Sequence, residues 1–376
     1  MQLVESHPDI RRQELAREYV RLVRWLSLAK LAMVGTVLLV LVFSDISTKL
    51  GYLLDIRQPW ASALYFLMLA VGLGAVTMPL TYYQSFVLPQ RYGLSNQKFG
   101  SWLADAAKVA ALAVLLGEVA VVVVYWFLAN LPGIWWFWAG ILLALISVLL
   151  THLAPILLLP LFFKLEPLAD IELKKKLMNL AKKARTRLAD VVIMDLSSKS
   201  TEANAMLAGL GNTRRIIISD TLVQQYSPDE VEVIMAHELG HHLHRDIPKL
   251  IAVQSAIIVL AFYTADWALR AGVSWLDYRG IADVAALPLL LLALAAFGFV
   301  VMPLINGYSR GLEIAADETA LALTGNPQAF VTAITKLIDQ NLTVANPGRW
   351  LELIFYDHPS YARRVDLARR YHQETA

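Results

Sequence analysis

Long runs without charged residues alternate with short basic segments along this chain. About 20 apolar residues suffice to cross a bilayer as a helix, because a helix satisfies its own backbone hydrogen bonds. The charge-free stretch 119–163 is too long for one span, and the polar break at 130–133 divides it into a helical hairpin. Six membrane spans are therefore predicted, at residues 25–44, 60–83, twice around 119–163, at 250–267 and at 284–306. The predicted fold class is mainly α and polytopic.

The lysines and arginines predict which side each segment faces. They are frequent in the N-terminal segment before residue 25, in the polar stretch 164–249 and in the C-terminal segment. Short loops rich in Lys and Arg stay in the cytoplasm, and an even number of spans returns both termini to one side. The prediction is a multi-pass integral membrane protein with both termini and the stretch 164–249 on the cytoplasmic side. Its parts are a four-span membrane domain (1–163), a cytosolic insert (164–249), two further spans (250–306) and a C-terminal cytosolic helical part (307–376).

Composition agrees with this class and narrows the chemistry. The chain has 376 residues, of which 57% are hydrophobic and only 17% are charged, and its formal net charge is +2. That small charge is not the electrostatic signature of a nucleic-acid-binding protein. The chain has no cysteine, so a metal site must use histidines and carboxylates. The expected partner from composition is membrane lipid, with no nucleic acid.

The cytosolic insert is predicted to be a small α+β unit. Apolar residues recur at helical spacing from Leu173 to Ala184 between lysines and arginines, which is typical of an amphipathic helix. Residues 191–196 and 214–219 are predicted strands, and 203–207 fits either an extended or a helical segment. Ser227, followed by Pro228 and by Glu230 three residues on, is a capping box that predicts the start of a helix.

That helix contains the sequence His237-Glu238-Leu239-Gly240-His241. A spacing of four puts both imidazoles on one helical face, where they can bind a single Zn²⁺, and Glu238 lies beside the metal as general base. The motif predicts a metalloprotease that uses one catalytic zinc ion.

A catalytic zinc needs a third protein ligand. Position 247 is Ile, so the histidine that some related motifs carry there is absent. After His241, the predicted topology leaves only Asp246 and the carboxylates beyond the sixth span on the same side of the membrane as the two histidines. Among these Glu313 and Asp317 lie on one side of a predicted helix, with Glu313 as candidate ligand and Asp317 as the residue that orients a ligand imidazole.

At this point the sequence resembles the integral-membrane, zinc-dependent CAAX prenyl endopeptidases. The resemblance rests on several separate blocks between Trp60 and Arg364. They are Tyr92 to Gln97, Leu159 to Lys164, Ser200 to Gly209, Ser219 to Leu222, His237 to His241, Ser309 to Asp317, and His358-Pro359 with Arg364.

The resemblance implies a ring of membrane helices around a hydrated chamber, with a small zinc-metalloprotease (gluzincin-like) domain on the cytosolic face. It implies His237, His241 and Glu313 as zinc ligands and Glu238 as general base. It implies Asn204 and Ala205 on an edge strand to which substrate adds in extended form, and His358 and Arg364 as catalytic residues near the oxyanion or the substrate backbone. The implied substrate is a peptide or protein, C-terminally prenylated in the typical case of the family.

Two alternatives remain open at this stage. One is an HtpX-like quality-control protease that acts on misfolded membrane proteins. The other is a membrane scaffold without hydrolytic activity, in which protein fills the fourth position of a structural zinc ion, for example through His244.

Overall fold

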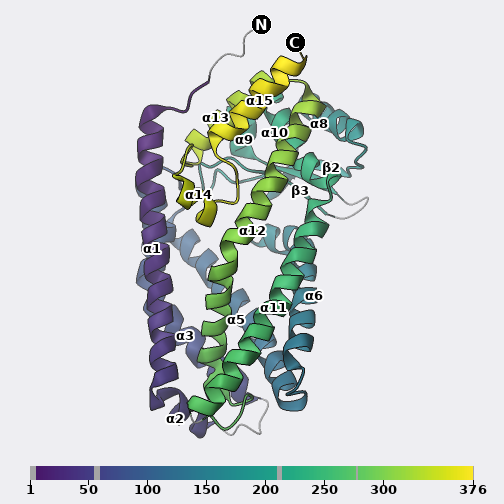
Figure 1. Cartoon of the computed structure of the whole chain (residues 1–376). Coiled ribbons are helices and arrows are strands. Elements are labelled where there is room, and N and C mark those ends of the chain that lie inside the picture. Colours follow the sequence, from purple (N-terminus) through teal and green to yellow (C-terminus); the bar gives the residue numbers. More distant parts are fainter. Residues whose placement is uncertain (1–5, 55–59, 210–213, 277, 376) are drawn as a thin grey trace.

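The computed structural model describes residues 6–54, 60–209, 214–276 and 278–375. Long helices run along the molecule, and both termini lie at the same end of it (Figure 1). The first half contains α1 (Ile10–Phe43), α2 (Asp45–Leu53), α3 (Trp60–Tyr82), α4 (Leu88–Arg91), α5 (Phe99–Asn130), α6 (Trp135–Leu153) and α7 (Leu159–Phe162). Single π-helical turns join α3 to α4 and α6 to α7, so each pair forms one continuous rod.

Within these ranges, six helices are long and apolar enough to cross a membrane. They are Ile10–Phe43, Trp60–Arg91, Phe99–Asn130, Trp135–Phe162, Asp246–Trp275 and Val284–Thr324. The prediction of six spans is confirmed. The third helix begins well before the charge-free stretch and includes two charged residues that pair with each other. The Lys108 ammonium donates to Asp105 (3.2 Å) and to the main-chain oxygen of Leu161 (2.9 Å).

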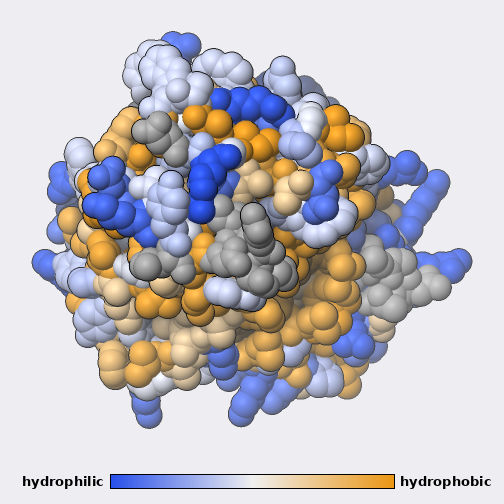
Figure 2. Space-filling view, turned by 90° about the horizontal axis from the view of Figure 1, so that it is seen from below, coloured by the Kyte–Doolittle hydropathy of each residue, from blue (hydrophilic) through white to orange (hydrophobic). Residues whose placement is uncertain are grey.

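The apolar core of the membrane bundle is concentrated at the end remote from the termini. Its buried side chains come from the end of α5 and the start of α6, for example Leu128 and Trp135, and from the end of α11 (Asp246–Trp275) and the start of α12 (Leu287–Thr324). Figure 2 looks onto this end, where hydrophobic side chains predominate and hydrophilic ones are interspersed. The helix halves nearer the termini contribute few side chains to this core. The hydrated chamber stays a prediction.

A four-stranded sheet lies at the other end of the molecule. Its strands are β1 (Leu165–Pro167), β2 (Asp190–Met194), β3 (Ala205–Ala208) and β4 (Arg215–Ser219), in the order β1-β2-β4-β3. β2 and β4 are parallel, whereas β1 and β3 run antiparallel to their neighbours. The ambiguous segment 203–207 is thus largely strand, and β3 is an edge of the sheet.

The helices around the sheet come from two separate parts of the chain. They are α8 (Ile171–Lys183), α9 (Asp220–Gln225) and α10 (Pro228–Leu243) from the insert, and α13 (Pro327–Gln340), α14 (Arg349–Phe355) and α15 (Tyr361–Thr375) from the C-terminal segment. One apolar core unites both parts, including Leu177, Ile216 and Leu239 from the insert and Phe330 and Ala368 from the C-terminal segment. Ser227 and Glu230 form the predicted capping box at the start of α10.

Candidate metal centre

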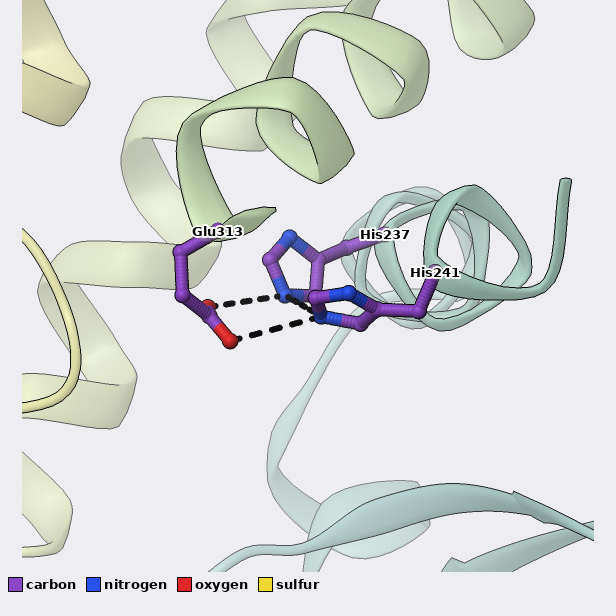
Figure 3. Close-up of side chains that lie close together, drawn as sticks. All are labelled: His237, His241 and Glu313. Carbon is purple, nitrogen blue, oxygen red and sulfur yellow. Dashed lines mark hydrogen bonds and ion pairs between the residues drawn. The ribbon is translucent and has the colours of Figure 1, made fainter. Parts of the chain in front are cut away.

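Helices α10 and α12 bring the predicted ligands together. His237 and His241 project from one face of α10, and Glu313 reaches them from α12 (Figure 3). The two Nε2 atoms are 3.2 Å apart. Glu313 Oε2 lies 3.3 Å from Nε2 of His237, and its Oε1 lies 3.4 Å from Nε2 of His241. Each residue offers one ligand atom, and these three atoms lie within 4.8 Å of one another.

Gly240 permits this close approach of the two helices. A Cβ atom at position 240 would lie 3.0 Å from the Cα atom of Ala316 and 3.1 Å from its carbonyl oxygen. Such distances are shorter than ordinary van der Waals contact, and main-chain atoms cannot turn away as a flexible side chain can. Glycine at the fourth position of the histidine motif therefore allows α12 to place Glu313 opposite both histidines.

Two buried carboxylates orient the histidine rings. Nδ1 of His237 lies 2.8 Å from Asp317 Oδ1, and Nδ1 of His241 lies 3.0 Å from Asp246 Oδ2. A carboxylate only accepts hydrogen bonds, so each ring donates its Nδ1–H and presents a lone pair at Nε2. Asp246 is thus the partner of His241 rather than a member of the three-residue group.

The donor set fits a metal cation. Two imidazole lone pairs and a carboxylate face one another, and Glu313 Oε2 is a buried atom without a hydrogen-bond partner among the described residues. Burial opposes a charge on His237, but the neighbouring carboxylates of Asp317 and Glu313 outweigh it and raise the pKa of that ring to about 10. The surroundings therefore favour positive charge at this point, which a divalent cation supplies. Histidine and carboxylate without thiolate suit Zn²⁺ among other divalent metals.

Glu238 borders the cavity beside the histidines. Burial raises the pKa of its carboxyl group, and the positive charges of His237 and His241 oppose that shift. A carboxyl group with a raised pKa takes up and returns a proton more readily near neutral pH than an ordinary glutamate. The cavity has a volume of about 430 Å³ and is lined also by Asn204 and Ala205, so the edge strand borders the metal centre.

His358 and Arg364 reach the same region from the C-terminal segment. Nε2 of His358 lies 3.3 Å from Glu313 Oε2. The hydrogen bond between the His358 ring and Asp357 raises the pKa of that ring, and the negative charge of Glu313 raises it further. Arg364 donates to both oxygens of Asp317, from Nε at 2.8 Å and from Nη2 at 2.5 Å. Both residues line the cavity.

The other polar residues considered from the sequence lie elsewhere. Nε2 of His244 is 2.8 Å from the hydroxyl oxygen of Thr319, and His244 is not part of the three-residue group, so the geometry gives no support to the structural-zinc scaffold. Sequence reasoning missed Asp246 as a ring partner and missed Arg310 and Asn341, which are discussed below. The signal for Asp246 is its place directly after the helix of the motif, where Arg245 adopts a left-handed conformation and the chain turns into α11.

The molecule thus combines a bundle of membrane helices with a histidine–histidine–glutamate centre at the end where the termini lie. This combination defines the class of membrane metallopeptidases. Comparisons with known proteins give the same class. The profile of peptidase family M48 matches residues 167–372, and that of the "CAAX prenyl protease N-terminal, five membrane helices" family matches residues 7–164. The chain belongs to peptidase family M48 and is a metalloendopeptidase of the membrane. This confirms the family inferred from the sequence.

Several relatives match over most of their length. An uncharacterized metalloprotease, YhfN of Bacillus subtilis, is 28% identical over 88% of this chain and 79% of its own. A CAAX prenyl protease 1 homolog of Oryza sativa is 30% identical over 77% of this chain and 68% of its own. CAAX prenyl protease 1 of Saccharomyces cerevisiae is 27% identical, over 81% and 71%. The crystal structure of S. mikatae Ste24p shares the fold, with a TM-score of 0.82 and 23% identity over 97% of this chain and 92% of that one.

Proposed function

We propose that this protein is a zinc endopeptidase in which His237, His241 and Glu313 bind one catalytic zinc ion. The observation that carries the proposal is the convergence of three hydrogen-bond acceptors on one point, with Glu238 at the border of the same cavity. A zinc ion bound there polarises the scissile carbonyl group and lowers the pKa of water. Three protein ligands leave a coordination position open, as a catalytic site requires.

Glu238 is the general base and then the general acid of the proposed reaction. It takes a proton from the attacking water, and the same carboxyl group returns that proton to the leaving amine. The raised pKa of Glu238 supports this role, because it makes the carboxylate a stronger base toward the attacking water.

His358 and Arg364 stabilise negative charge in the proposed site. The raised pKa of His358 supports a protonated ring that donates a hydrogen bond to the oxygen on which charge develops. Arg364 is held by Asp317, the residue that also orients His237. The Asp317 carboxylate therefore fixes the position of the Arg364 guanidinium group relative to the proposed ligand His237.

The substrate adds to the outer edge of β3. Asn204 bonds toward β4, because its carbonyl oxygen accepts from the amide nitrogen of Ser219 at 2.9 Å. Successive residues of a strand alternate their hydrogen-bonding direction, so Ala203 and Ala205 turn their N–H and C=O groups to the outer edge. The Asn341 side chain pairs with both groups of Ala203 (2.9 and 3.1 Å). Ala205 is therefore the first position open to an extended peptide.

The proposed substrate is a peptide or protein with a prenylated C-terminus, as the names of the relatives suggest. The cavity supports apolar groups beside the scissile bond, because Leu222, Ile334 and Ile338 line it. The basic N-terminal, insert and C-terminal segments support a cytoplasmic location for the site and both termini. The division of the chain at residues 163, 249 and 306 belongs to the same proposal.

The test compares purified wild-type protein with the Glu238→Gln variant. Zinc content is measured for both, and cleavage is followed with a quenched farnesylated CAAX peptide and a matched peptide without the prenyl group. We expect one zinc per chain in both proteins and cleavage of the farnesylated peptide by the wild type alone. Cleavage by the zinc-loaded variant would overturn the role of Glu238. Equal cleavage of both peptides would replace the prenylated substrate with quality-control proteolysis.

A further inference from the structure

One face of α12 carries polar residues on both sides of the metal ligand. Asn306, Arg310, Glu313 and Asp317 follow one another at spacings of four, three and four, so they lie along the same side of the helix. Glu313 contacts the ligand histidines and Asp317 contacts His237. Asn306 and Arg310 have no part in that contact. Both contact α14, and Arg310 also contacts Tyr356, the residue that follows it.

Arg310 and Asn306 bind main-chain oxygens at the end of α14. Nη1 of Arg310 donates to the carbonyl oxygen of Glu352 at 2.8 Å and to that of Tyr356. Nδ2 of Asn306 donates to the carbonyl oxygen of Ile354 at 2.6 Å. The last carbonyl groups of a helix have no partner within it and carry partial negative charge. Arg310 and Asn306 thus cap α14 from a different helix.

The burial of Arg310 shows that this contact is more than a surface hydrogen bond. Arg310 is only 9% exposed. Its burial is costly in free energy, because the guanidinium group loses the hydration that it has in water. Among the described residues its hydrogen bonds go to main-chain oxygens, and it forms no ion pair. A buried cation that is bound to two carbonyl oxygens fixes the path of the main chain to which they belong.

The chain held in this way leads directly to His358. Tyr356, whose carbonyl oxygen Arg310 binds, is two residues before His358, and both side chains line the cavity of the metal centre. Nε2 of His358 lies 3.3 Å from Glu313 Oε2. Arg310 and Glu313 are three residues apart on α12, so this helix determines both the position of the metal ligand and the position of the loop opposite it.

We propose that Arg310, assisted by Asn306, is a positioning residue that holds His358 at the metal centre by fastening the end of α14 to α12. The inference rests on the role that the proposed function gives to His358. Arg310 does not itself line the cavity, and its hydrogen bonds go to Glu352 and Tyr356 rather than to a metal ligand. Its effect on the reaction therefore passes through the loop Tyr356–His358.

A double-mutant cycle tests this connection. The Arg310→Ala, His358→Ala and double variants are compared with the wild type for kcat, KM and zinc content. Because displacing a catalytic group by about 1 Å costs on the order of 100-fold in rate, we expect Arg310→Ala to lower kcat by about 10- to 100-fold with zinc retained. In the His358→Ala background the same substitution should change kcat less than about twofold. Equal losses of kcat in both backgrounds, or loss of zinc, would overturn the proposal.

Two matched variants separate positioning from general destabilisation. Arg279→Ala removes another partly buried arginine that donates to a main-chain oxygen, that of Gly51, at the opposite end of the molecule. It should leave kcat unchanged. Arg310→Lys retains a cation that can donate to a carbonyl oxygen, and it should restore most of the kcat lost in Arg310→Ala. A specific role of Arg310 would be contradicted if Arg310→Lys did not restore kcat and Arg279→Ala lowered kcat as much as Arg310→Ala does.

Hydrogen–deuterium exchange gives a measurement that does not depend on activity. In Arg310→Ala, amides of residues 349–360 should exchange faster, while those of α10 should be unchanged. Unchanged exchange in 349–360 would overturn the proposal whatever the kinetics. If His358→Ala alone leaves kcat unaltered, the oxyanion role in the proposed function is wrong, and the exchange data still decide whether Arg310 holds the loop.

Discussion

Nδ1 of His237 lies 2.8 Å from Oδ1 of Asp317, and the same carboxylate accepts two hydrogen bonds from Arg364. Asp317 is completely buried. It therefore fixes the orientation of the His237 ring and compensates the charge of the partly buried Arg364 guanidinium group at the same time. His241 has a simpler partner in Asp246, whose second hydrogen-bonding neighbour is the half-exposed Lys249.

This difference predicts unequal effects of the two Asp→Asn substitutions. Both should weaken zinc binding about 10- to 100-fold, because each replaces the carboxylate that orients a ligand imidazole with a neutral amide, whose oxygen is a weaker acceptor. Asp317→Asn should also lower the melting temperature, since it leaves the partly buried Arg364 without its charge partner. Competition with a chelator and thermal unfolding measure the two effects. Asp229→Asn, at an exposed carboxylate paired with Lys176, is the control and should leave zinc affinity unchanged.

The contact between α10 and α12 gives a second prediction. Gly240→Ala places a methyl group 3.0 Å from the Cα atom of Ala316, so the two helices must separate. We expect a loss of about 1–3 kcal/mol in the free energy of unfolding and weaker zinc binding. Gly311→Ala on α12, where an added Cβ meets no atom within 4 Å, should stabilise by about 0.5–1 kcal/mol instead. Equal stability of the two variants in thermal unfolding would count against the tight contact.

Asn341 predicts where the substrate lies on the edge strand. Asn341→Ala frees the N–H and C=O groups of Ala203, so an extended peptide gains a further pairing position beyond Ala205. We expect this variant to cleave one peptide at more than one bond and the wild type to cleave it at a single bond. Mass spectrometry of the products measures this, and zinc content checks that the metal centre is intact. An unaltered product pattern would show that Asn341 does not limit the register.

Asp220 predicts a pH dependence of stability. Burial disfavours its ionised form, but hydrogen bonds from the Ser197 hydroxyl and from the amides of Ser197, Leu196 and Thr221 outweigh it and lower the pKa of the carboxyl group. Its folded-state pKa lies below the unfolded value of about 3.9, so its contribution is complete above pH 3.9 and is lost as the pH falls through the folded-state pKa. Asp220→Asn should therefore lower the melting temperature at pH 7, with a difference from wild type that narrows in acid.

Much of the architecture could be predicted because it is local. The spans follow from hydrophobic length, and the start of α10 follows from the short-range chemistry of Ser227 and Glu230. His237 and His241 are neighbours on any helix, so their spacing alone identifies a metal pair. Strand β1 escaped prediction because three residues are too few for an alternating pattern.

The rest depends on contacts between residues far apart in the chain. The sequence leaves Asp246 as a candidate ligand, and in the structure the turn at Arg245 places it against Nδ1 of His241. Asn341 lies 138 residues from Ala203, and Arg310 lies 46 residues from Tyr356. Hydrogen bonds of a side chain to a distant main chain leave no periodicity in a sequence, so only the folded structure reveals them.

The shared core of the insert and the C-terminal segment has a consequence for how the protein is made. His237 and His241 are synthesised before the helical pair α11 and α12, and Glu313 is synthesised near the end of that pair. Both helices must enter the bilayer and the second must return before the third ligand can reach the first two. If these three residues bind the metal as proposed, metal binding is a late step of biogenesis, and an unfinished or misinserted chain remains without the centre that would make it a protease.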